Sequence, residues 1–237
     1  MQVKLFDKPV GLEDRDRLCD VKPFKKRVHP HGRQVAHDKV ERLLTFCGDS
    51  PAEWARGRAM VAGMAYCGLQ RSEVLALDFG HVDLGGRSLV VRDAKRDAYR
   101  WLPLRDPVVE YLRPWLTQRG DRPGPLFCVI SQHQLPTHRR LSGEGVTWIL
   151  GHMVGRTGVS RPSPQDLRKY FCTSLQEAGV DELLVRQLLG YVSLDTTLRY
   201  DRRSLRQAVD ATWRPAAADL RLGEGRPAPY GLFEKIA

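Results

Sequence analysis

Apolar residues recur at helical spacing over most of the chain from position 34 onward. They predict a first helix after Gln34, along a stripe made of Val35, Val40, Leu43, Leu44 and Cys47. Asp49-Ser50-Pro51 predicts the start of a second helix, because proline suits the first turn and an acid follows it. That helix should end at Cys67-Gly68. Further helices are expected over residues 71–77, 106–119, 142–154, 165–178, 181–189 and 205–212.

Short β-branched and aromatic runs predict the strands. Residues 82–87 suggest a strand and turn, and residues 88–91 and 99–104 predict two strands around a polar tip. A short strand is expected over 126–130, and residues 132–140 suggest a loop. Pro114 should kink the helix over 106–119 or end it early. The fold class expected is mainly α with a small antiparallel β-sheet (α+β).

Composition and charge divide the chain and indicate its partner. Residues 1–33 are basic and broken by proline and glycine, so we expect an N-terminal arm or linker that includes the cations Lys25, Lys26 and Arg27. One domain should follow over 34–213, and residues 214–237 form a tail that either docks on a second protomer or folds on its own domain. The net charge of +10 favours a polyanion such as nucleic acid.

Several classes of protein are disfavoured. The 5 cysteines are scattered without a Cys-x-x-Cys pair, which argues against a zinc ribbon or a disulfide framework and favours buried free thiols. The His29-Pro30-His31 triplet has no partner ligands nearby, so no metal or other cofactor is expected. No long apolar run indicates a membrane span, and we expect a cytoplasmic protein that associates with the nucleoid.

Five motifs then follow one another in a fixed order. They are Gly68-Leu69-Gln70-Arg71-Ser72-Glu73, Lys95 ahead of Leu102-Pro103-Leu104, Pro164-Gln165-Asp166-Leu167-Arg168-Lys169, Leu189-Gly190-Tyr191, and Thr197-Leu198-Arg199-Tyr200. Together they resemble the catalytic domain of the tyrosine recombinase (phage integrase) family across roughly residues 34–212. Each motif alone is a weak signal, because a single arginine or tyrosine is more often structural.

The resemblance assigns chemical roles. Tyr200 would attack a DNA phosphate and form a 3′-phosphotyrosyl link, while Arg168 binds the non-bridging oxygens that gain charge. Lys95 would protonate the leaving 5′ oxygen. Arg96 and Lys169, and with them Lys25, Lys26 and Arg27 of the N-terminal arm, are expected to contact DNA. The implied partner is double-stranded DNA, on which the protein should self-associate, alone or with another recombinase.

Three positions depart from the family pattern at its charged residues. Gln70 stands where the family has an arginine, with Arg71 displaced by one position, about 100° around a helix. Gln165 and Tyr191 each replace a histidine; both can still donate hydrogen bonds, but neither carries charge at neutral pH. The site therefore resembles a weakened recombinase.

Two functions stay open from the sequence. One is a site-specific recombinase or integrase that cuts and rejoins DNA through Tyr200. The other is a non-catalytic DNA-binding relative that regulates or partners an active recombinase. A relaxing activity like that of type IB topoisomerases is a more distant alternative.

Overall fold

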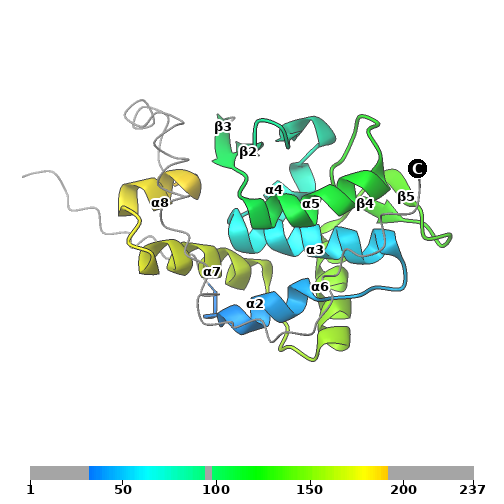
Figure 1. Ribbon diagram of the computed structural model, residues 1–237, viewed down its shortest axis with the longest axis horizontal. Coiled ribbons are helices and arrows are strands. Elements are labelled where there is room, and N and C mark those ends of the chain that lie inside the picture. The colour runs from blue at the N-terminus through cyan, green and yellow to red at the C-terminus, as the bar shows by residue number, and fades with distance from the viewer. Residues whose placement is uncertain (1–31, 94–97, 192–237) are drawn as a thin grey trace, which may run out of the picture.

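A computed structural model of the protein describes residues 32–93 and 98–191 (Figure 1). The helices are α2 (His37–Leu44), α3 (Pro51–Tyr66), α4 (Arg71–Ala76), η1 (Phe79–His81), α5 (Asp106–Arg119), α6 (Gly143–Thr157), α7 (Pro164–Glu177) and α8 (Glu182–Leu188). The strands are β1 (Val82–Asp83), β2 (Ser88–Asp93), β3 (Ala98–Pro103), β4 (Cys128–Ile130) and β5 (Pro136–Arg140). This confirms a mainly helical fold with small antiparallel sheets.

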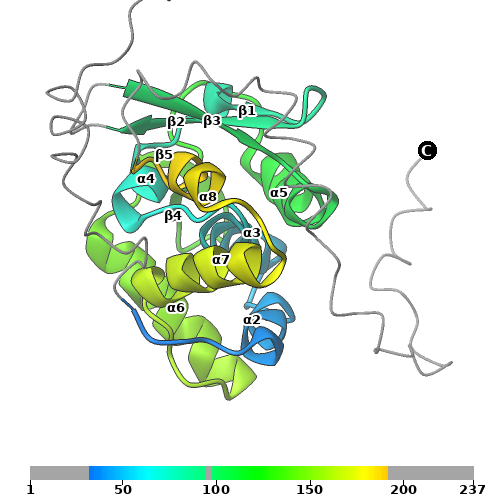
Figure 2. The same cartoon turned by 90° about the vertical axis from the view of Figure 1, so that its left-hand side faces the viewer.

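Helix α3 is the centre of the core, with α2, α5, α6 and α7 packed around it (Figures 1 and 2). Its start is fixed as the sequence predicts: Pro51 takes the first turn, and the Ser50 side chain accepts a hydrogen bond from the backbone N–H of Glu53. Small and flexible residues such as Ala59 and Met60 are buried on every face. A helix that is apolar all round belongs in the interior, so α3 can be covered from several sides.

The three-stranded sheet has the order β1-β2-β3, and both of its pairs are antiparallel. Figure 2 shows it along one edge of the helical body. Leu89 pairs with Leu102 and Val91 pairs with Arg100, and both apolar β2 residues are buried. Because side chains alternate along a strand, Arg100 and Leu102 share the face of β3 turned toward the helices.

One prediction needs correction, and one of the two alternatives left open for Pro114 is excluded. Residues 132–140 are not all loop, because β5 pairs with β4 to form a second, two-stranded sheet. The strand β5 is polar and mostly exposed, so it lacks the apolar alternation that identifies strands. Helix α5 also does not end early at Pro114 but continues to Arg119. The next side chain, Trp115, is fully buried and donates to the Leu126 carbonyl at 2.9 Å, which holds the last turns in place.

The described cysteines follow the expected pattern in three cases of four. Cys67, Cys128 and Cys172 are buried free thiols, whereas Cys47 is exposed because α2 ends before reaching it. Burial raises the pKa of the Cys67 thiol to about 12, so it stays protonated at neutral pH. No helix in the described ranges has the length and apolar composition needed to cross a bilayer.

Candidate active site

Arg168 lies where three of the sequence motifs meet. It sits in α7, whose first turn is capped by Ser163, and it is completely buried. One guanidinium nitrogen, Nη1, donates to the Gly68 carbonyl at 2.5 Å, and Nη2 donates to the Leu189 carbonyl at 2.6 Å. The structure therefore joins the motif at 68–73, the motif at 164–169 and the motif at 189–191 through one side chain.

A buried carboxylate holds a second arginine beside Arg168. Glu73 lies 3.6 Å from Nη1 of Arg168 and accepts two hydrogen bonds from Arg100, at 2.5 and 2.9 Å. Arg100 also donates from Nε to the Leu188 carbonyl at 3.0 Å, which ties β3 to α8. Two guanidinium groups thus share one carboxylate, which offsets part of the cost of taking their charges out of water.

Glu73 and Arg100 are functional candidates that the sequence reasoning missed. Glu73 is the last residue of the Gly-Leu-Gln-Arg-Ser-Glu motif, but the motif alone does not indicate what its carboxylate contacts. The sequence indicates Arg100 more clearly. It stands two positions before Leu102 and so shares a face of the strand with it, which places a charge on the buried face. A charge on that face requires a buried partner, and the partner is Glu73.

Gly68 makes the contact between α3, α7 and the α8 end possible. Its φ of +64° is left-handed, and a Cβ there would stand 2.4 Å from Cδ1 of Phe171. Any larger residue would therefore be strained and would also clash. Gly190, with φ +74°, ends α8 in the same conformation and lies against Arg100.

Gln70 and Arg71 are adjacent in the chain but contact different parts of the fold. Gln70 is the N-cap of α4, and its backbone N–H donates to the Glu73 carboxylate at 2.7 Å, so it borders the buried cluster. Arg71 is exposed, and its guanidinium lies 3.8 Å from the position that a Cβ on Gly143 would take. Arg71 thus points toward the start of α6, and the extended backbone of Gln70, rather than a helical step of 100°, sets the relation between the two residues.

Of the two residues that replace family histidines, Tyr191 contacts Arg168, and Gln165 is exposed. The ring of Tyr191 has its centroid 5.1 Å from Cζ of Arg168, a cation–π contact, and the residue is 37% exposed. Gln165 lies in the first turn of α7 with its side chain exposed. Lys169 is engaged elsewhere, because its ammonium donates to the Gly32 carbonyl at 2.9 Å.

The remaining predicted residues lie outside the described part of the chain. They are the nucleophile candidate Tyr200, the hairpin residues Lys95 and Arg96, and the arm residues Lys25, Lys26 and Arg27. The predicted helix over 205–212 and the tail over 214–237 lie outside it too. The described part contains Arg168, Glu73, Arg100 and Tyr191, which contact one another.

Comparison with known proteins finds tyrosine recombinases that are similar to this chain. Tyrosine recombinase XerA of Pyrococcus furiosus is 27% identical over 212 residues, covering 88% of this chain and 70% of the relative. Tyrosine recombinase XerC of Vibrio campbellii is 32% identical over 194 residues, covering 79% of this chain and 59% of the relative. The chain thus spans between 59% and 70% of the length of these two relatives.

Solved structures have the same fold. The crystal structure of XerA recombinase superposes with a TM-score of 0.56 at 25% identity, covering 78% of this chain and 67% of that one. The integrase of mycobacterium phage Brujita gives 0.57 at 23% identity, covering 82% and 63%. The model of the phage integrase family matches residues 33–206, which include all five motifs. The chain belongs to the phage integrase family.

Proposed function

We propose that this protein is a site-specific DNA recombinase that cleaves and rejoins DNA strands through Tyr200. The observation that carries the proposal is the buried Arg168, held by two carbonyls and by the Glu73 carboxylate that it shares with Arg100. A guanidinium is suited to stabilise the negative charge that develops on a phosphate, because it can donate to two oxygens at once. Membership of the family supports the same conclusion.

The proposed reaction is a phosphoryl transfer without metal or other cofactor. The phenolic oxygen of Tyr200 gives its proton to water and bonds to phosphorus, and the bond from phosphorus to the 5′ oxygen breaks. Lys95 gives a proton to that departing oxygen. A free phenol has a pKa near ~10 and is a weak nucleophile at neutral pH, so cations must stabilise the transition state. In the reverse step a 5′ hydroxyl attacks the phosphotyrosine, and the bond energy is conserved.

The proposed partner is double-stranded DNA. The net charge of +10 supports it, and so does the XerH recombinase, of the same fold, whose structure is described as bound to its difH substrate. We further propose self-association on DNA, alone or with another recombinase, because joining two sites requires two DNA-bound protomers. A place in the cytoplasm, on the nucleoid, follows from the same partner.

The test is a covalent trap. The protein is incubated with a pool of nicked duplexes of randomised sequence, in which cleavage releases a short fragment and prevents rejoining. We expect a protein–DNA adduct that survives detergent with the wild type and none with Tyr200→Phe. Tyr99→Phe is the matched control, because Tyr99 is 57% exposed on β3, and it should form the adduct normally. An adduct that persists in Tyr200→Phe would refute the role of Tyr200.

A second candidate function is supported by one specific observation. Gln70 borders the Glu73 carboxylate while Arg71 points toward Gly143, so the cluster has a neutral residue where the family has a cation. The protein would then bind DNA without cutting it, and regulate or partner an active recombinase. Salt-dependent DNA binding with no adduct would favour this function. In that case Gln70→Arg should restore cleavage by roughly 10²–10³-fold over background, the usual worth of one such donor.

A further inference from the structure

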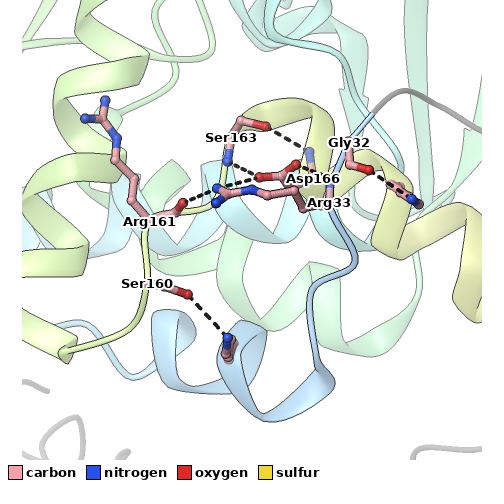
Figure 3. A network of polar contacts seen from close by, with 8 residues as sticks. Gly32, Arg33, Ser160, Arg161, Ser163 and Asp166 are labelled. Carbon is pink, nitrogen blue, oxygen red and sulfur yellow. Dashed lines mark hydrogen bonds and ion pairs between the residues drawn. The ribbon is translucent and has the colours of Figure 1, made fainter.

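A basic pocket of about 210 Å³ lies between the segment that precedes α2 and the connection from α6 to α7 (Figure 3). It borders the first turn of α7 but does not include Arg168. Its lining consists of Arg33, Gln34, Val35, Lys39, Ser160, Arg161, Pro162 and Asp166. None of these side chains is aromatic, so a nucleobase would find no stacking surface there.

Asp166 forms the floor and is already satisfied by its neighbours. It is only 3% exposed and accepts hydrogen bonds from the backbone N–H of Arg33 at 2.6 Å and of Ser163 at 2.9 Å (Figure 3). Burial by itself would raise its pKa, but the hydrogen bonds from Ser163 and Arg33 hold that pKa below its usual range. The carboxylate is therefore charged at neutral pH and orients Arg33.

Arg33 is fixed in place and still open to a ligand. Its Nη2 donates to the Arg161 carbonyl at 2.9 Å and to Asp166 at 3.2 Å, yet its side chain is 75% exposed. A guanidinium has five N–H donors, so most of them remain for an oxyanion. A pre-oriented arginine loses less side-chain entropy when it binds than a free one does.

Lys39 and Ser160 face each other at the other end of the pocket. The Lys39 ammonium donates to the Ser160 hydroxyl at 3.3 Å, and no carboxylate between residues 32 and 93 or 98 and 191 forms an ion pair with it. Arg161 adds a charge at the rim, although its guanidinium points away from Arg33 and donates to the Thr147 carbonyl (Figure 3). Three cations and one carboxylate leave a net charge of +2 on the lining.

We propose that this pocket binds one backbone phosphate of DNA, outside the phosphate that is cleaved. The exposed groups are a guanidinium, an ammonium and a hydroxyl, all of which can donate to phosphate oxygens. The proposal rests on the DNA-binding function proposed above. Because Asp166 links Arg33 to the first turn of α7, a phosphate bound here would also anchor the helix that carries Arg168.

The salt dependence of DNA binding tests the proposal. Duplex binding is measured by fluorescence anisotropy between ~50 and ~200 mM salt, where each lost phosphate contact reduces the slope of log K against log salt by about 0.9. We expect Lys39→Gln to reduce the slope by about that amount, while Lys39→Arg retains it. Arg113→Gln, which removes an exposed charge from α5, is the matched control for net charge. Lys39 is exposed, so the melting temperature of the variant should match that of the wild type.

The outcomes separate the two proposals. If Lys39→Gln has the same slope as Arg113→Gln, the pocket proposal is wrong while DNA binding stands. If the wild type itself shows no salt-dependent binding, the proposed function fails as well. Calorimetry with inorganic phosphate distinguishes the source of the phosphate. A Lys39-dependent heat of binding, without any change in the DNA slope, would assign the pocket to free phosphate and overturn its assignment to DNA.

Discussion

Replacing Glu73 by glutamine should destabilise the fold strongly, because it leaves the buried Arg168 and the partly buried Arg100 without their shared anion. Glu73 is 7% exposed and binds Arg100 through both carboxylate oxygens, with Arg168 at 3.6 Å. Removing one partner of a buried ion pair costs about 3–5 kcal/mol. In a domain of this size each kcal/mol lowers the melting temperature by ~2–4 °C, so we expect a decrease of roughly 6–20 °C.

Urea denaturation and thermal melting measure this effect. Glu110→Gln is the matched control, because Glu110 is exposed on α5, and it should change the free energy of unfolding by less than about 0.5 kcal/mol. The double variant Glu73→Gln/Arg100→Gln should recover part of the loss, since it also removes one of the two unpaired cations. A loss below about 1 kcal/mol for Glu73→Gln would refute the argument that this carboxylate holds the site together.

Two further predictions concern the same region. Gly68→Ala should destabilise the protein by about 2–5 kcal/mol in urea, from a left-handed φ and a Cβ 2.4 Å from Phe171. Gly120 also has a left-handed φ, +76°, but open space around it. Gly120→Ala should therefore lower the free energy of unfolding only by the cost of the backbone strain, about 1–2 kcal/mol. Because the folded pKa of Asp166 is lowered, its stabilisation is present above the unfolded pKa of ~3.9 and disappears as pH falls through the folded value. The stability difference between wild type and Asp166→Asn should therefore shrink below about pH 4, and a difference that is independent of pH would contradict this.

The sequence predicts most of the fold because its local signals agree with its packing. Ser50-Pro51 begins α3 where expected, and the Cys67-Gly68 break ends it, since glycine is needed there for a left-handed φ. Pro114 shows the limit of such signals. Its local cost is outweighed by the burial of Trp115, a tertiary effect that no local pattern contains.

The candidate site was predicted less completely than the fold. Motif order identified Arg168, but its contacts depend on three segments that are distant in sequence. The pairing of Glu73 with Arg100 joins α4 to β3, and helical periodicity alone could not show which residue would face the carboxylate. The helical step of 100° does not describe Gln70 and Arg71, because Gln70 is an extended N-cap before α4, and it is the backbone N–H of Gln70 that contacts Glu73.

The central claim is that Tyr200 becomes joined to DNA, and mapping the covalent bond tests it most directly. Adducts trapped on nicked duplexes would be digested with nuclease and protease, and the modified peptide would be sequenced by mass spectrometry. The account predicts one nucleotide-bearing residue, Tyr200, attached through a 3′ phosphate. A nucleotide on any other side chain, or attachment through a 5′ phosphate, would contradict it.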